Sequence, residues 1–449
     1  MNLLPNKEAA REIFSIGGPA IAGLASQMVV SVVDTAMVGR LENARIVLAA
    51  MGLGLLATWA ITSLFSSLST GTHVLVARRH GQRNLVAVGE VLNNSLFISL
   101  ILGVIVGTIG YVSSYEVINF FAKDNAVAVT GTDYMKYRFL GLPFFLLIVS
   151  YRGFFYGIGQ TKIFMYDAMI VNVSNVVLNY LLIYGALGFP RMELAGAGLA
   201  SSLATAFGWM FFVVVTMLRS YRRTYRYFSH FKLSWEMIRQ IVKISLPVSL
   251  QNILILVGFL VFVAIAGVIG TLEQAASQVV ITALFFSFMP CFGLGIAAQT
   301  LVGQMIGSGE VQRAQRYGFE AAKIGTFFTF AIGVLFVLFP EAVLIVVTTD
   351  KVIIEAARLP LQIAGVAQVF YGGGIILANA LQAGGATLYV MFVEVLTHWI
   401  VFLPLAYLFG VELGGGIRGA WLALPVYIVL YTLLNVLKFR SGNWLKSTL

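Results

Sequence analysis

Residues 13–39 read "IFSIGGPAIAGLASQMVVSVVDTAMVG" and contain one charged side chain, Asp34. A run of about 20 mostly apolar residues is long enough to cross the hydrocarbon core of a bilayer as a helix. A carboxylate inside such a run costs at least about 2.5–3.5 kcal/mol on insertion scales, so it needs a partner, water or a proton. The stretch therefore predicts a transmembrane helix that carries a functional group.

The composition extends this prediction to the whole chain. Of its 449 residues, 59% are hydrophobic and 11% are charged, and the mean hydropathy is +0.90. Soluble domains have roughly 45–50% apolar and about 25% charged residues. The single cysteine, Cys291, excludes an intrachain disulfide and a metal site built from cysteines. We expect an all-α integral membrane protein without a metal site or a cofactor.

The hydropathy pattern predicts twelve transmembrane helices. Their approximate limits are 13–40, 47–76, 91–112, 132–157, 163–185, 195–218, 240–268, 275–306, 318–340, 356–382, 386–409 and 417–438. Most of the 29 Lys and Arg residues fall in the terminal segments and in the loops on the same side. This asymmetry predicts that both termini are cytoplasmic, and we expect a bacterial or archaeal cytoplasmic (inner) membrane. The basic stretch 219–232 is then a topology signal, and no nucleic acid is expected as a partner.

The two halves of the sequence resemble each other, which predicts an internal repeat. The paired positions are Pro19 with Pro247, Gly81 with Gly307, Gly159 with Gly384, and Gly196 with Gly419. The separation falls in order from 228 to 223 residues, as small loop deletions would produce.

The repeat predicts two six-helix bundles, because each half contains six of the twelve helices. We place helices 1–6 in residues 1–218, a basic cytoplasmic linker at 219–239, and helices 7–12 in 240–449. Six is an even number, so both halves enter the membrane from the same side and form parallel repeats.

Several motifs resemble those of the multidrug and toxic compound extrusion (MATE) family. They are Pro19 followed by "VVDTAMVG", then "VARRHGQRN", "RGFFYGIGQTK" and "NVVLNYLLIYG…AGAGLAS", with echoes in the second half. The resemblance covers essentially the whole chain. It implies two lobes around a central cavity, and alternating access that exports drugs or metabolites in exchange for H⁺ or Na⁺. The implied partners are a small-molecule substrate and membrane lipid, and we expect a monomer.

A polar stripe runs along the first predicted helix. Gln27, Ser31 and Asp34 are spaced at i, i+4 and i+7 and therefore share one face of an otherwise apolar helix. Polar groups inside a membrane bundle should face one another or water, because lipid offers them no hydrogen bonds. We interpret this face as lining a cavity.

The fifth predicted helix carries a second stripe, formed by Asn172, Asn175 and Asn179, and the sixth adds Ser201. Asparagines also join packed membrane helices without any further function, and this alternative stays open for the amides alone. A carboxylate on the neighbouring stripe favours a cavity.

The family resemblance assigns roles to some of these residues. Asp34 matches the helix-1 aspartate that couples transport to a cation, and Asn175 and Asn179 match a helix-5 pair lining the same pocket. Met37 and Tyr371 are candidates for lining the substrate cavity, together with the stripe residues. Pro19 is a hinge candidate because proline removes a helical hydrogen bond, although it could equally cap the helix.

The choice of coupling ion depends on acids that this sequence lacks. Many family members carry aspartate where this chain has Asn179, so Asp34 is left as the only acid of the pocket. NorM-like members also have acids near the positions of Ile255 and Tyr371. Hard cations need several charged and carbonyl oxygens, so the resemblance favours a DinF-like, proton-coupled transporter. Na⁺ coupling is the alternative.

Two further acids lie inside predicted helices, Asp167 and Glu394, and both fall near helix starts where the dipole favours them. Glu394 has His398 four residues later, which makes the pair a secondary candidate for an ion pair or a proton relay.

Other functional classes are less well supported by the residues. The chain has no phosphate-binding loop and no H-E-x-x-H motif, which disfavours a membrane enzyme. A channel has no reason to keep one mid-span acid. A lipid-linked oligosaccharide flippase would need several basic residues inside its spans, and only Arg152 comes near.

Overall fold

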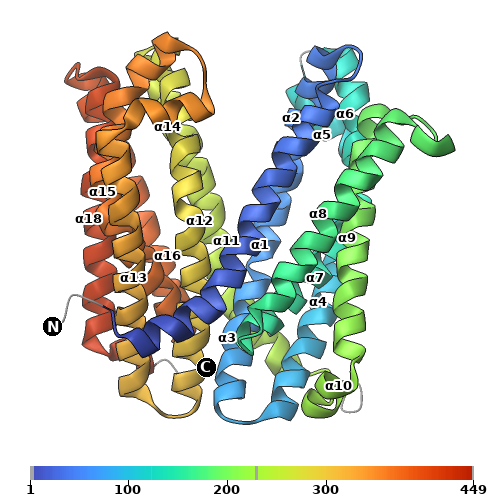
Figure 1. The fold of residues 1–449 in the computed structure, drawn as a ribbon, viewed down its shortest axis with the longest axis vertical. Coiled ribbons are helices and arrows are strands. Elements are labelled where there is room, and N and C mark those ends of the chain that lie inside the picture. Colours follow the sequence, from blue (N-terminus) through green and yellow to red (C-terminus); the bar gives the residue numbers. More distant parts are fainter. Residues whose placement is uncertain (1–4, 123, 228–230, 447–449) are drawn as a thin grey trace. The chain divides into compact units, whose positions relative to one another are not determined.

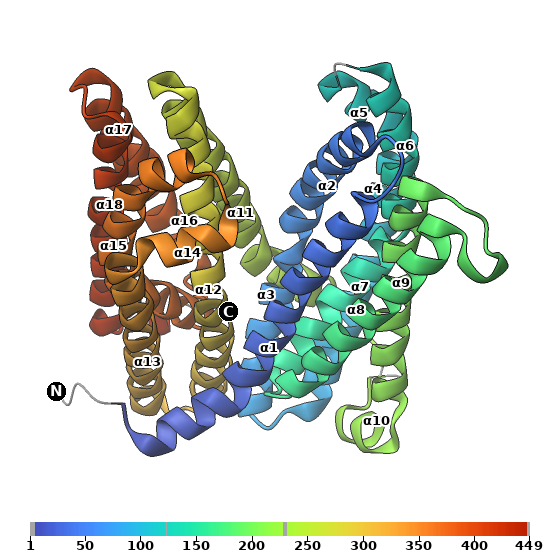
Figure 2. The ribbon, with the colours of Figure 1, turned by 45° about the horizontal axis from the view of Figure 1, so that its top comes forward.

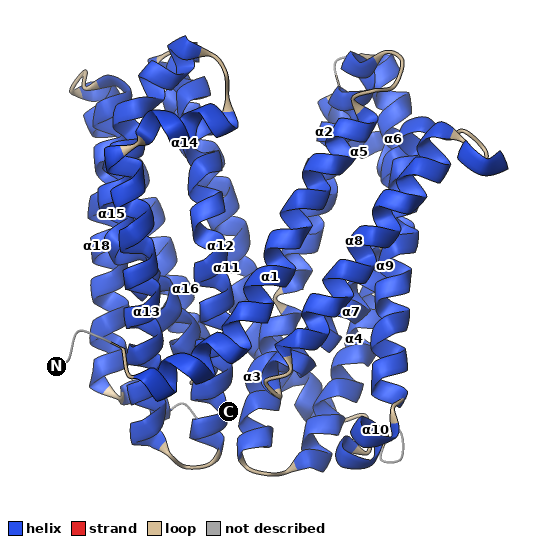
Figure 3. Cartoon of the chain, in the orientation of Figure 1, coloured by secondary structure: helices blue, strands red, loops and turns tan. Residues whose placement is uncertain are grey.

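The computed structural model describes residues 5–122, 124–227 and 231–446, and in these ranges the chain is helical without a β-strand (Figure 3). Among the described residues, eleven helices are long and apolar enough to span a membrane, and a bent pair of helices makes a twelfth if it is counted as one span. This number agrees with the twelve predicted spans. Helices are the natural solution here, because every backbone polar group inside a bilayer must be satisfied within the segment.

The first six spans contain several short breaks (Figure 1). The elements are α1 Lys7–Val38, α2 Ala44–Ser66, α3 Leu68–Gly81, α4 Leu85–Val112, α5 Ser114–Phe121, α6 Asn125–Leu140, α7 Leu142–Gly157, α8 Thr161–Tyr184, η1 Ala186–Gly188, α9 Glu193–Met217 and α10 Arg219–Tyr225. Helices α6 and α7 form the bent span, with an angle of 44° between them. Pro143 follows this break, where its missing N–H group costs the helix no hydrogen bond.

The last six spans include two segments of π-helix. The elements are α11 Trp235–Ile269, α12 Thr271–Gly307, α13 Val311–Leu338, α14 Pro340–Val347, α15 Lys351–Ala383, α16 Thr387–Val395, η2 Leu396–Phe402, α17 Leu403–Tyr407, η3 Leu408–Glu412, α18 Gly416–Ser441 and η4 Asn443–Lys446. Here η2 and η3 are the π-helical segments. Both lie in the eleventh span, which is otherwise α-helical.

The helices pack into two compact units. The N-terminal unit comprises residues 22–249, and the C-terminal unit comprises residues 250 onward together with the start of the chain up to Ile21. Two long helices therefore contribute to both units. Helix α1 changes unit after Ile21, just beyond Pro19, and α11 changes unit after Ser249, just beyond Pro247.

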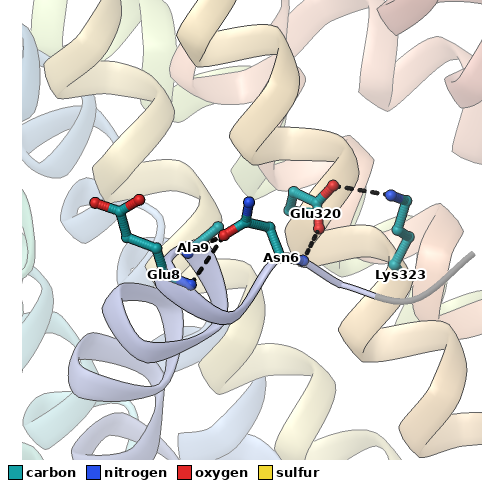
Figure 4. A network of polar contacts seen from close by, with 5 residues as sticks. All are labelled: Asn6, Glu8, Ala9, Glu320 and Lys323. Atoms are coloured by element: carbon teal, nitrogen blue, oxygen red, sulfur yellow. Dashed lines mark hydrogen bonds and ion pairs between the residues drawn. The ribbon is translucent and has the colours of Figure 1, made fainter. Parts of the chain in front are cut away.

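The first half of α1 is fixed to the C-terminal unit by polar and close contacts. The N–H group of Asn6 donates to Glu320 Oε2 at 2.7 Å, and the other carboxylate oxygen of Glu320 accepts from Lys323 Nζ at 2.8 Å (Figure 4). The side chain of Asn6 caps the helix by accepting from Glu8 N at 2.9 Å. Further along, Gly17 approaches α12 closely, as small residues do at membrane helix interfaces.

The first part of α11 is fixed to the N-terminal unit in a corresponding way. Gly71 of α3 lies against Ser245 and leaves no room for a side chain of its own. Ser67 is hydrogen-bonded to Ser249. The preceding linker is also attached, since Asn94 of α4 donates to Lys232 O at 3.0 Å and accepts from Ser234 N at 2.8 Å. Residues 228–230 of the predicted linker lie outside the described residues.

The packing units therefore differ from the predicted division into 1–218, 219–239 and 240–449. The sequence repeat places all of α1 in the first half and all of α11 in the second. Each helix is continuous through its proline, so its first part packs with the other unit. Sequence similarity reports the ancestry of a segment, whereas packing reports which neighbours it contacts.

Equivalent spans pack together in the two units. In the N-terminal unit α8 lies beside α9, and α4 lies beside α7. In the C-terminal unit the segments of the eleventh span lie beside α18, and α13 lies beside α15 (Figure 2). The turns also correspond: residues 83 and 309 both have positive φ, and so do Gly159 and Gly385. The sequence pairing of Gly159 with Gly384 is therefore wrong by one residue, because the backbone conformation identifies Gly385 as the partner.

Candidate functional site

Asp34 lies in the last turns of α1 and is half-buried in the N-terminal unit. Its carboxylate accepts a hydrogen bond from Asn179 Nδ2 at 2.6 Å. Asn179 is fully buried on α8, the fifth span, so this contact joins the first and fifth spans. The two polar stripes thus meet at the carboxylate.

The hydrogen bonds continue away from Asp34 through a second amide. Asn179 Nδ2 also donates to Asn175 Oδ1 at 3.1 Å, and Asn175 Nδ2 donates to Ser201 Oγ at 3.2 Å. Asn175 and Asn179 are one helical turn apart, and Ser201 comes from α9. Four predicted site residues therefore form one connected network across three spans.

Arg138 is a neighbour of this network that the sequence analysis missed. It lies on α6, within the bent span, and its positive charge acts on Asp34. The earlier statement that only Arg152 comes near the spans is therefore wrong. The signal was present in the sequence, because Gly141 and Pro143 mark a bend inside the span and Arg138 lies just before it.

A small polar cavity of about 50 Å³ adjoins the network. The polar side chains that line it are Thr58, Thr62, Arg138, Ser201, Ser202 and Thr205. Ser201 thus connects the amides to the cavity. The volume exceeds the roughly 10–15 Å³ that one water needs, so the cavity can hold solvent beside the network.

The other predicted residues of the N-terminal unit are placed less closely around Asp34. Gln27 and Ser31 are exposed on α1, whereas Asn172 and Met37 are half-buried. The carbonyl oxygen of Met37 accepts from Tyr184 OH at 2.7 Å, which joins the end of α1 to the end of α8. The assignment of Gln27, Ser31, Met37 and Asn172 to a substrate cavity stays a prediction. The hinge at Pro19 also stays a prediction.

Asp167 lies near the start of α8, as predicted, and is buried against neighbouring helices. It lies in the second turn and is only 2% exposed. Gly208 of α9 makes room for it, since a Cβ there would lie 2.6 Å from Asp167 Oδ1. The cation that acts on Asp167 is Arg152 of α7, whose guanidinium packs over the Phe164 ring at 4.7 Å. Arg152 therefore has a structural partner.

The remaining predicted residues belong to the C-terminal unit. Tyr371 of α15 packs against Phe288, with the ring centroids 4.4 Å apart. Glu394 of α16 and His398 of η2 are both buried, and the closest approach of their polar atoms is 4.0 Å. The i, i+4 pairing predicted from the sequence is therefore present at the edge of ion-pair distance.

The MatE family model matches residues 19–181 and matches again over residues 247–408. The chain belongs to the MATE family. The double match is independent evidence for the repeat, and its starts at Pro19 and Pro247 reproduce the predicted pairing of these prolines. As a MATE transporter, the protein is not an enzyme.

Comparisons over the full length agree with this assignment. The chain is 27% identical to "Probable multidrug resistance protein NorM" of Thermotoga maritima, covering 99% of this chain and 96% of that protein. It is 23% identical to "Multidrug resistance protein MdtK" of Yersinia pseudotuberculosis, covering 97% and 96%. Its fold is similar to an outward-facing multidrug resistance MATE family transporter of the MOP superfamily, with a TM-score of 0.89, 22% identity and coverage of 99% and 98%.

Proposed function

We propose that this MATE transporter exports amphipathic, cationic drugs or metabolites in exchange for H⁺, with protonation of Asp34 as the coupling step. The observation that carries the proposal is the position of Asp34 in the network. A half-buried carboxylate inside a span contacts buried amides and has Arg138 nearby. Intramembrane carboxylates of this kind mark ion pathways.

The hydrogen-bonding partners of Asp34 support H⁺ as the coupling ion. Asp34 accepts a hydrogen bond from an amide N–H, and this group cannot serve as a ligand for a metal cation. A hard cation is held by several oxygen ligands, and the oxygen of Asn175 is already used by Asn179. A proton needs only one oxygen atom. Na⁺ coupling is the alternative that the experiment below separates.

Alternating access would couple the two fluxes through Asp34. When the site faces outward, the carboxylate takes a proton, and its attraction for a cationic substrate is lost. When the site faces inward, the proton leaves, and Arg138 stabilises the ionised carboxylate until the next substrate binds. In this scheme Gln27, Ser31, Met37, Asn172 and Tyr371 line the substrate cavity.

The proposal includes the membrane in which the transporter lies, its orientation there and its oligomeric state. The excess of Lys and Arg on one side supports cytoplasmic termini, and the relatives with bacterial sources support a cytoplasmic membrane. We expect the monomer to be the transporting unit, with residues 1–218 and 240–449 as the two repeats. Pro19 and Pro247 occupy equivalent positions where the helices change packing unit, which supports both as hinges.

Proteoliposomes test the proposal directly. Vesicles with an acidic lumen should accumulate the cationic dye ethidium through the protein, whereas an imposed Na⁺ gradient at equal pH should not drive uptake. Asp34→Asn should reduce the pH-driven rate at least about tenfold, the effect of losing one strong charged interaction. The measurement is the initial rate of change in ethidium fluorescence.

The matched control is Asp133→Asn, which makes the same chemical change at an exposed position of α6. It should transport as the parent protein does. Uptake driven by Na⁺ alone would replace H⁺ by Na⁺ as the coupling ion. An unchanged pH-driven rate in the Asp34 variant would show that this carboxylate does not couple transport.

A further inference from the structure

The C-terminal unit contains a second intramembrane carboxylate, Glu394, in a setting unlike that of Asp34. Glu394 is 5% exposed and accepts a hydrogen bond from Tyr427 OH at 2.5 Å. Buried carboxylates are normally paired with a cation or kept neutral. Within the described residues no Lys or Arg forms an ion pair with Glu394, and the nearest nitrogen of His398 is 4.0 Å from its carboxylate.

His398 is buried beside Glu394, and the backbone of Gly258 lies against its ring. It is 1% exposed, and neither of its ring nitrogens has a hydrogen-bond partner among the described residues. Its ring is enclosed by Phe259, Phe402 and Tyr427, with centroid separations of 5.2–5.3 Å. An imidazole with both nitrogens unpaired in an apolar enclosure loses the free energy of those bonds, which calls for an explanation.

The backbone around this histidine is adapted to it on two sides. Gly258 of α11 leaves the space that the ring occupies, because a Cβ at Gly258 would overlap His398 Nε2. On its own helix His398 lies in η2, where the helix widens to π geometry. Such widened turns cost hydrogen-bond geometry and occur frequently at functional sites.

Other polar groups face the carboxylate from each helix packed around it. Tyr427 and Tyr431 come from α18, and Gln251 comes from α11. Tyr371 of α15 and, beyond it, Cys291 of α12 complete the titratable groups nearby. The hydroxyl groups and the thiol are uncharged near neutral pH. The carboxyl and the imidazole are therefore the acid and the base of this cluster.

We propose that Glu394 is a second proton-binding site of the transport cycle, with His398 as the residue that passes the proton to and from it. The inference rests on the proposed proton exchange and adds one proton to it, so that each substrate would be exchanged for two protons. It is carried by the juxtaposition of a buried carboxylate, an unbonded imidazole and a widened helical turn. Asp34 and Glu394 would then serve the two units separately.

The proton transfer balances without any further reactant. A proton from water binds one nitrogen of the neutral imidazole, and the other nitrogen gives up its proton to the Glu394 carboxylate. The product is a neutral carboxylic acid and a neutral imidazole with its tautomer exchanged. The 4.0 Å between His398 Nδ1 and Glu394 Oε1 is longer than a hydrogen bond, so the transfer needs a closer approach or one water molecule. Tyr427 holds the accepting oxygen in place throughout.

The number of protons can be measured by a reversal experiment. Proteoliposomes are prepared with a tenfold ethidium gradient across the membrane, and potassium with valinomycin holds the membrane potential at zero. The pH gradient is then varied. The measurement is the pH gradient at which net dye flux stops. Exchange of two protons should balance the dye at about half a pH unit, and exchange of one proton at about one pH unit. We expect the parent protein at about half a unit and Glu394→Gln at about one unit.

Two further variants separate the carboxylate from the histidine and from general damage. His398→Asn should slow the flux but leave the reversal gradient at the parent value, because Glu394 still binds its proton. Glu355→Gln is the matched control, since it removes an exposed carboxylate from α15. It should change neither quantity. A reversal shift in His398→Asn equal to that of Glu394→Gln would overturn the assignment of the carboxylate as the acceptor.

If Glu394→Gln does not transport, its reversal gradient cannot be measured. Infrared difference spectra of the solubilised, full-length protein then test the protonation of Glu394 directly. Spectra taken between about pH 5 and about pH 8 should contain a carboxylic acid band that disappears in Glu394→Gln and persists in Asp34→Asn. An identical band in Glu394→Gln would refute the second site.

The outcomes distinguish this inference from the proposed function. Reversal at about one pH unit in both the parent and Glu394→Gln would leave proton exchange at Asp34 intact and reject the second proton. A dye flux that ignores the pH gradient altogether would reject the proposed function instead.

Discussion

Each of the two units contains a carboxylate inside a membrane span, and the surroundings of the two carboxylates differ. In the N-terminal unit, Asp34 is half-buried and contacts an amide network that leads to a small polar cavity beside Arg138. In the C-terminal unit, Glu394 is buried among aromatic rings and tyrosine hydroxyls, and the imidazole of His398 is 4.0 Å away. The first carboxylate is linked by hydrogen bonds to a cavity that can hold water, and the second is enclosed.

The difference follows from what occupies equivalent places in the repeat. With the separation of 226 residues set by the Gly159 and Gly385 turns, His398 takes the place of Asn172. With the separation of 228 set by the prolines, the buried ring of Phe262 takes the place of Asp34. An amide of the first unit thus corresponds to a histidine in the second, and the acid of the first span corresponds to an aromatic ring. A duplicated scaffold has retained its helix packing while the chemistry of its two interiors has diverged.

The largest expected effect comes from filling the space that His398 uses. Gly258→Ala places a methyl group on the imidazole, so the ring must move or the helices must separate. Overpacking of this kind costs about 1–3 kcal/mol, and we expect a lower apparent melting temperature of the solubilised protein together with slower transport. Gly52→Ala is the control, since a Cβ at Gly52 meets nothing within 4 Å. Equal behaviour of the two variants would show that the enclosure around His398 is not tight.

A smaller effect is expected from the cation of the N-terminal site. Arg138→Met removes the charge that favours the ionised form of Asp34, so proton release should become slower. We expect a dye exchange rate about tenfold lower, which corresponds to the loss of one charged interaction. Arg138→Lys keeps the charge and should retain most of the rate. If the methionine variant transports at the parent rate, Arg138 is a packing residue and not part of the coupling site.

The smallest effect concerns the equivalent turns after the second and eighth spans. Arg83 has φ of 58° where the second repeat has Gly309 with φ of 81°. A side chain costs about 1–2 kcal/mol in this conformation. Arg83→Gly should therefore raise the apparent melting temperature slightly, and Gly309→Ala should lower it by a similar amount. Thermal unfolding of the solubilised variants measures both, and shifts of the same sign would contradict the equivalence of the turns.

Much of the fold followed from the sequence because a bilayer restricts the choices. A run long enough to cross the hydrocarbon core must be helical, so the spans could be located from apolar length alone. The stripe of Asn175 and Asn179 could be drawn as one face because the helical period places residues four apart together. The prediction that this stripe faces Asp34 followed from one further rule, which is that polar faces inside a membrane avoid lipid.

The surroundings of the charged residues followed less well from the sequence. Arg138 was missed and Asp167 was assigned to a helix start, because sequence position indicates depth only when a span is straight and its limits are known. The bend between α6 and α7 brings Arg138 into the interior, and the close approach of Gly208 buries Asp167. Burial depends on what the neighbouring helix leaves open, and that is a property of two segments together.

The sequence by itself determined that this protein is a duplicated helical membrane protein with an acid in its first span, because length, hydropathy and periodicity are local properties. Only the tertiary structure decided which amide donates to that acid, that Arg138 is its cationic neighbour, and that α1 and α11 each contribute to both packing units. The physical reason is that the helical period fixes which residues share a face, whereas the partner of that face is chosen by the packing of side chains distant in the sequence.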